Sequence, residues 1–96
     1  MAIGVTAKLT ILEGKNEECE GLFTKLVEAV NANESGCNFY AIHQSRSDTQ
    51  VYIVLEQYTD EEALSAHGKT DYFRSLGAEM GGCMAAAPDI EYMDAI

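Results

Sequence analysis

Apolar and polar residues alternate along the first part of the chain, from residue 2 to residue 12. A period of two is typical of a strand with one buried face. The buried face would carry Ile3, Val5, Ala7, Leu9 and Ile11. We expect a turn at residues 13–16, where Glu, Gly, Lys and Asn follow one another.

The pattern changes to a helical period at Asn16. Apolar residues then recur every three or four positions, at Cys19, Leu22, Phe23, Leu26 and Val30. This spacing predicts an amphipathic helix of about four turns, with Asn16 as its N-cap. We expect the helix to end between residues 31 and 36.

Two strands are predicted next, at residues 37–47 and 50–59, with a short turn between them. Residues 51–55 of the second strand are apolar on both faces. A strand of this kind is usually covered on both sides.

Helical signals return after the third strand. Thr59 and Glu62 have the spacing of a capping box and predict a short helix, whose inward side would carry Ala63, Leu64 and His67. Gly68 interrupts this helix, and Thr70 is the expected N-cap of a second helical piece. Its inward residues would be Phe73, Leu76, Gly77 and Met80. Pro88 then precedes a last strand.

The order β-α-β-β-α-β predicts an α+β, ferredoxin-like fold, in which a four-stranded antiparallel sheet carries its helices on one face. We expect a single domain spanning residues 1–96. The central strands also have apolar residues on the second face, more than a monomer usually leaves exposed. We therefore expect a homodimer in which two sheets pack face to face.

Charge and composition exclude several kinds of partner. Among 96 residues, 16 Asp and Glu against 6 Lys and Arg give a net charge of −10. Such a chain repels nucleic-acid phosphates and anionic lipids, so we expect neither nucleic acid nor membrane as a partner. No apolar run reaches the ~20 residues that span a bilayer, and the first residues do not form a secretory signal.

The cysteine and histidine residues give no sign of a disulfide framework or a metal site. Three cysteines at wide spacing favour a reduced, cytoplasmic protein. Cys37 and Cys83 are expected to pack as small apolar residues. His43 and His67 are the only histidines, and no ligand spacing joins them to the cysteines, so no metal is expected.

Three motifs follow one another through the middle of the chain. They are Gly36-Cys37-x-x-Tyr40, Glu56-x-Tyr58, and Ala63-Leu64-x-x-His67 with Phe73 six residues further on. Together they resemble the motifs of the antibiotic biosynthesis monooxygenase (ABM) family, which usually has Trp where this chain has Tyr58.

The resemblance implies a dimeric α+β barrel with a pocket between sheet and helices in each protomer. It also implies cofactor-independent oxygenation of a quinol or another enolisable aromatic small molecule. In this chemistry the substrate loses a proton, supplies the electrons itself and reacts with O₂. Other members of the family isomerise a small sugar derivative, degrade haem or have no established activity.

His67 is the residue we expect to handle protons, because its spacing from Ala63 and Leu64 turns it inward. The alternative is a structural histidine at a helix end. The candidate substrate-binding residues are Tyr72, Phe73, Tyr58, Tyr52, Glu56 and His43. Aromatic side chains would suit a flat phenolic ligand, and a tyrosine hydroxyl can hydrogen-bond an oxyanion.

Each candidate also has a structural interpretation. The aromatic residues could simply pack in the core or at the dimer interface, and Glu56 could form a salt bridge. Two other functions therefore stay open beside oxygenation. One is an isomerase or lyase reaction on a small polar carbonyl compound, and the other is ligand binding by a non-catalytic dimer.

Overall fold

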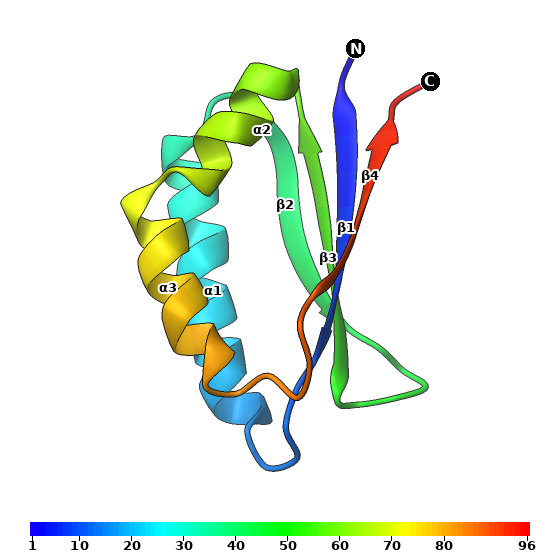
Figure 1. Ribbon diagram of the computed structural model, residues 1–96, viewed down its shortest axis with the longest axis vertical. Coiled ribbons are helices and arrows are strands. Elements are labelled where there is room, and N and C mark those ends of the chain that lie inside the picture. The colour runs from blue at the N-terminus through cyan, green and yellow to red at the C-terminus, as the bar shows by residue number, and fades with distance from the viewer.

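The computed structural model describes residues 1–96 and confirms the predicted order of elements (Figure 1). The single discontinuity is the break at Gly68, which divides the second helical region in two as the sequence predicts. The elements are β1 (Ile3–Thr10), α1 (Asn16–Asn33), β2 (Cys37–Gln44), β3 (Val51–Tyr58), α2 (Glu61–Gly68), α3 (Asp71–Gly81) and β4 (Asp89–Asp94).

The four strands form one sheet in the order β2-β3-β1-β4, with all neighbours antiparallel. The α+β, ferredoxin-like fold is thus confirmed. Figure 1 shows the three helices together on one face of the sheet, and the other face without any covering element. No helix is both long enough and apolar enough to cross a membrane.

The core lies between α1 and the sheet, where the two apolar periods of the sequence meet. Helix α1 contributes the four buried side chains Cys19, Phe23, Leu26 and Val30. The inner face of β1 contributes Ile3, Val5, Ala7 and Leu9. Burial of these side chains is the main favourable term in folding, at roughly 1.5–3 kcal/mol for each large one.

Two of the three predicted N-caps are wrong. Helix α2 is capped by Asp60, whose Oδ1 accepts from Ala63 N–H at 2.9 Å, and not by Thr59. The reason is that Thr59 N–H donates to the Gly36 carbonyl and continues the pairing of β3 with β2. Asn16 lies inside α1, and its side chain donates to Thr49 O and Tyr52 Oη instead. The prediction for Thr70 is confirmed, since its Oγ1 accepts from Phe73 N–H.

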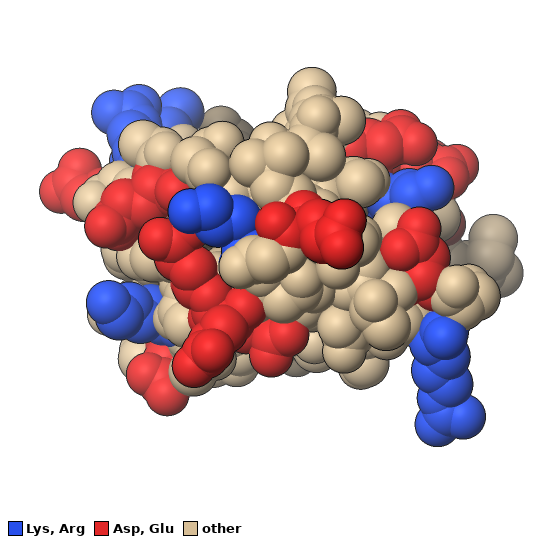
Figure 2. All heavy atoms as spheres, turned by 90° about the horizontal axis from the view of Figure 1, so that it is seen from below, with Lys and Arg blue, Asp and Glu red and all other residues tan.

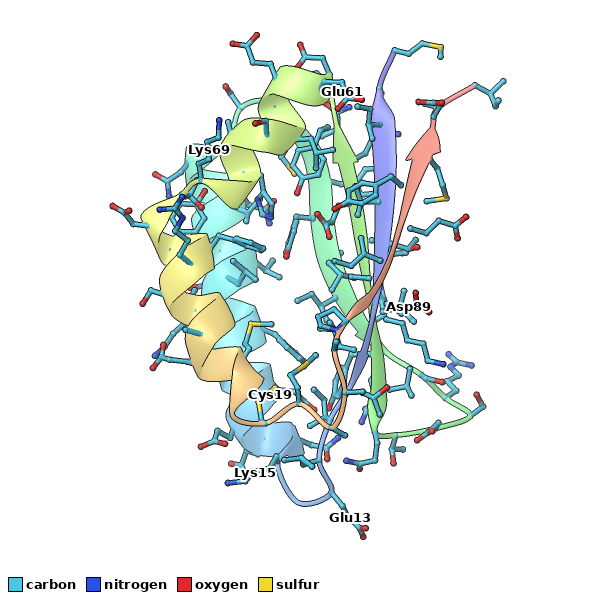
Figure 3. The ribbon with its side chains drawn as sticks, viewed as in Figure 1. Glu13, Lys15, Cys19, Glu61, Lys69 and Asp89 are labelled. Carbon is cyan, nitrogen blue, oxygen red and sulfur yellow. A yellow bond between two sulfur atoms is a disulfide. The ribbon has the colours of Figure 1, made fainter.

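The expectation that the cysteines form no disulfide is also wrong. Cys19 and Cys83, 64 residues apart, form a disulfide that joins α1 to the segment after α3. Figure 3 shows Cys19 on α1 beside that segment. The spacing of the cysteines along the chain does not indicate this disulfide, because the two cysteines meet only when α3 packs against α1. Cys37 is the one free cysteine.

The outer face of the sheet keeps the apolar character that the sequence predicts. Phe39, Leu55 and Met93 are 47%, 38% and 39% exposed there. His43 lies on the same face, opposite Ile53 in the pairing of β2 with β3.

Figure 2 shows that acidic side chains gather over the end of the molecule seen from below, with only a few Lys and Arg among them.

Candidate functional site

A cavity of about 920 Å³ lies between the inner face of the sheet and the helices. Sixteen of its 24 lining residues are hydrophobic, so it suits an apolar ligand of drug-like size. Val5, Ala7 and Leu9 of β1 form one wall, and Phe73 and Met80 of α3 form the opposite wall.

The cavity opens to solvent beside β4. Ile90 and Tyr92 line it, yet they remain 46% and 62% exposed. The segment from Met84 to Pro88, which connects α3 to β4, lines the same side. Its start is held in place because Ala85 N–H donates to Thr10 O at 2.7 Å.

His67 lies at the end of α2 and reaches the cavity from the helix side. It is 5% exposed, and its Nδ1 is 2.9 and 3.1 Å from the two carboxylate oxygens of Glu34. Glu34 also accepts a hydrogen bond from the Tyr72 hydroxyl. No protein group hydrogen-bonds Nε2, and this atom is not among the fully enclosed polar atoms, so it is free to meet a ligand.

Three aromatic rings hold the imidazole in place. The ring centroids of Tyr40, Tyr58 and Phe73 lie 5.4, 5.3 and 4.6 Å from that of His67. The six-residue spacing of His67 and Phe73 therefore brings these rings into contact across the break between α2 and α3.

Glu56 is the second titratable group of the cavity and is 8% exposed. Its Oε1 accepts from the Tyr58 hydroxyl at 2.6 Å. Burial raises the pKa of the Glu56 carboxyl, while the Tyr58 hydrogen bond and the charge of His67 oppose this rise. Glu56 does not form the salt bridge given as its structural alternative, because its hydrogen-bond partner is a tyrosine rather than a basic residue.

Tyr40 supplies a hydroxyl without a protein partner. The side chain is 5% exposed and lines the cavity. Burial, reinforced by the charges of Glu56 and Glu34, raises the pKa of Tyr40 far above its ordinary value. The hydroxyl therefore stays protonated and can donate a hydrogen bond to a ligand oxygen.

The structure brings some of the sequence-predicted site residues together and separates others. His67, Glu56 and Phe73 line the cavity. Tyr58 and Tyr72 lie behind it, where their hydroxyls donate to Glu56 and Glu34.

Tyr52 and His43 are not cavity residues. The Tyr52 ring packs on Phe23 at a centroid distance of 5.1 Å, and its hydroxyl donates to Glu20. Although Tyr52 is in phase with Glu56, α1 covers its end of β3, so its ring fills the core there. His43 points away from the helices because it alternates with Tyr40 and Ile42, which line the cavity.

Two polar residues of the site are not among the candidates that the sequence suggests. Tyr40 belongs to the first motif but not to the candidate substrate-binding residues, and in the structure its hydroxyl without a protein partner distinguishes it. Glu34 follows the last residue of α1, where a glutamate is commonly solvated. No signal in the chain indicates that it meets α2 and α3. No group of three or more His, Cys, Asp or Glu residues is arranged to hold a metal ion.

The sequence and the structure were compared with those of known proteins. The family model described as antibiotic biosynthesis monooxygenase matches residues 2–78. No curated protein matches the sequence.

Several solved structures are similar to this chain. A candidate antibiotic biosynthesis monooxygenase from Caulobacter crescentus CB15 is 47% identical, with 99% of this chain and 90% of that chain covered and a TM-score of 0.97. A conserved protein from Methanosarcina mazei Go1 is 27% identical, with 97% and 91% covered and a TM-score of 0.92. A Mycobacterium tuberculosis protein at 16% identity shares the fold, with 100% and 96% covered and a TM-score of 0.92.

Proposed function

The chain belongs to the antibiotic biosynthesis monooxygenase family, and on this premise we propose that it oxygenates a quinol or another enolisable aromatic molecule without a cofactor. The observation that carries the proposal is the cavity itself. Its walls are mostly apolar, and His67, Glu56 and Tyr40 are among the polar residues that line it. A flat aromatic compound with one ionisable hydroxyl or acidic C–H group matches this arrangement.

The reaction begins with a proton transfer. For a substrate with a CH₂ group next to an aromatic carbonyl system, His67 Nε2 takes a proton and leaves an enolate. The Tyr40 hydroxyl donates a hydrogen bond to the enolate oxygen, where the negative charge gathers. Exclusion of water by the apolar walls strengthens both interactions.

The electrons then pass from substrate to O₂. The enolate carbon forms a bond to oxygen, and the resulting peroxide anion takes the proton back from the His67 imidazolium. Loss of the remaining C–H proton and cleavage of the O–O bond yield a carbonyl and water. The sum is R₂CH₂ + O₂ → R₂C=O + H₂O, in which carbon loses four electrons and O₂ gains them.

The two alternative functions receive less support. An isomerase or lyase for a small polar carbonyl compound would suit a cavity lined by several charged groups, whereas this one is mostly apolar. A pocket filled by Phe73, Met80 and Met84 would favour a non-catalytic dimer. Here these three residues line an open cavity.

Oxygen consumption tests the proposal. The protein is mixed with hydroquinones and anthrones in an oxygen electrode, and the quinone products are followed by absorbance. We expect one O₂ consumed per anthrone, and a loss of about 10²–10⁴-fold in kcat in His67→Ala. His43→Ala is the matched control. It removes the only other histidine, which lies on the outer face of the sheet and away from the cavity, and should leave kcat unchanged. Equal rates in wild type and His67→Ala, or no consumption with any compound, would refute the proposal.

A further inference from the structure

The hydrogen bonds of Glu34 connect three helical segments. Glu34 directly follows α1, His67 lies at the end of α2 and Tyr72 lies in the first turn of α3. Both carboxylate oxygens of Glu34 are within hydrogen-bond distance of His67 Nδ1, at 2.9 and 3.1 Å, and one of them also accepts from Tyr72.

The Glu34 carboxylate decides which nitrogen of His67 carries the proton. An ionised carboxylate can only accept hydrogen bonds, so Nδ1 must be the donor. When His67 is neutral, its single N–H proton is therefore on Nδ1, and Nε2 keeps its lone pair. Free histidine prefers the opposite tautomer, so the local contacts must impose this one.

Glu34 is fixed well enough to impose it. Its side chain is 11% exposed. Its backbone N–H donates to Val30 O at 2.9 Å, and its carbonyl accepts from Cys37 N–H at 3.0 Å. The Tyr72 hydroxyl holds the carboxylate from the side of α3.

The imidazole cannot easily turn over to satisfy Glu34 in another way. It is packed against three rings, and a half-turn would point a carbon atom at the carboxylate and lose the hydrogen bond. The titratable groups around His67 come from every element packed on it: Glu34, Tyr40, Glu56, Tyr58 and Tyr72. Among these groups only Glu34 hydrogen-bonds the ring, while the Oε1 atom of Glu56 accepts from Tyr58.

We propose that Glu34 is a positioning residue, which holds neutral His67 in the Nδ1–H tautomer and so presents the Nε2 lone pair to the cavity. The tautomer follows from the geometry alone. Its consequence for turnover rests on the proposed function, because a base at Nε2 is needed only if the substrate must lose a proton there.

Nitrogen-15 NMR of the two histidines tests the tautomer directly. In wild-type protein with a neutral imidazole, we expect His67 to show a protonated Nδ1 and an unprotonated Nε2. His43, on the outer face, serves as the internal reference and should favour the Nε2–H form. A wild-type His67 with its proton on Nε2 would overturn the proposal.

Glu34→Ala tests the assignment to Glu34. We expect His67 to shift toward the Nε2–H form in this variant, whereas Glu28→Ala, which removes an exposed glutamate of α1, should leave the spectrum unchanged. If Glu34→Ala does not fold, as judged by circular dichroism, Glu34→Gln replaces it and should show a mixture of tautomers. An unchanged Nδ1–H signal in the folded variant would overturn the role of Glu34.

Kinetics separate this proposal from the function on which it rests. We expect Glu34→Ala to lower kcat by about 10–100-fold with little change in KM, since the apolar walls that bind substrate are untouched. A folded Glu34→Ala variant with wild-type kcat would refute the catalytic consequence. If the wild type consumes no oxygen, the proposed function fails, and the NMR result still decides the tautomer.

Discussion

Glu56 is the most deeply buried acid of the protein. Burial disfavours its ionised form and so lowers the stability of the folded state when the carboxyl is ionised. The hydrogen bond from Tyr58 and the charge of His67 compensate only in part for the loss of water. The folded state therefore holds the Glu56 proton to a higher pH than the unfolded chain does. Tyr58, fully buried, donates to Glu56 and not to a ligand.

We predict that Glu56 makes the protein less stable as pH rises. Because the folded-state pKa of Glu56 is raised, its contribution is fully favourable below the unfolded value of about 4.3. It is lost as pH rises through the folded value. Glu56→Gln should remove this dependence, so the variant gains stability relative to wild type as the pH rises above about 4.3, the unfolded value. Urea unfolding at several pH values measures the difference, and a constant or shrinking difference would contradict it.

At the scale of elements, Gly36, the residue directly before β2, permits a close contact between β2 and α2. A Cβ atom on Gly36 would lie 2.7 Å from Ala63 Cβ, which no real pair of such atoms tolerates. The start of β2 and the first turn of α2 thus approach each other closely. The hydrogen bond from Thr59 N–H to Gly36 O fixes the same junction.

We predict that Gly36→Ala destabilises the fold by about 1–3 kcal/mol, because α2 must move away from the sheet. The matched control is Gly21→Ala on the exposed side of α1, where a Cβ meets nothing within 4 Å. That change should stabilise the protein by roughly 0.5–1 kcal/mol, as alanine is the better helix former. Chemical unfolding compares the two variants. Equal effects would mean that the Gly36 contact does not limit the packing of α2.

The Cys19–Cys83 disulfide joins the first turns of α1 to the segment that follows α3. We predict that the double variant Cys19→Ala/Cys83→Ala unfolds with a free energy lower by about 2–4 kcal/mol, mainly because the unfolded chain gains freedom. Cys37→Ala is the control, since Cys37 forms no disulfide. Unfolding under non-reducing conditions gives the comparison. Two free thiols at these positions in the native oxidised protein would show that the bond is absent.

The strands and helices could be predicted from the sequence because each has one clear apolar period. Every residue predicted for the buried face of the first strand is buried in the structure. The errors at the caps and cysteines share a cause, which is that they depend on neighbours far away in the chain. Thr59 loses its capping role to the pairing of β3 with β2, and Cys19 meets Cys83 through helix packing. The motifs located His67, but Glu34 could not be found without the fold.

At the scale of the whole molecule, the uncovered face of the sheet calls for a partner. We predict a homodimer joined through this face, with Phe39, Leu55 and Met93 at its centre. Sedimentation should give about 21 kDa, twice the chain mass of 10.5 kDa. Leu55→Asp should shift the protein to monomers, because it buries a charge in the interface.

The control for the dimer is Leu12→Asp, which alters an exposed leucine in the turn after β1 and away from the sheet face. It should leave the mass unchanged. A wild-type protein that sediments as a single chain at all concentrations would contradict the dimer.

The central claim is that His67 accepts a proton from a substrate bound in the cavity and that the site stabilises the anion that results, for which a bound phenol is a convenient probe. Binding of a nitrophenol without oxygen tests it most directly, because the ionised form absorbs in the visible range. An apolar cavity beside Glu34 and Glu56 would by itself raise the pKa of a bound phenol. We predict that the pKa falls on binding to wild type and does not fall in His67→Ala. A bound phenol whose pKa rises in both proteins would contradict the claim.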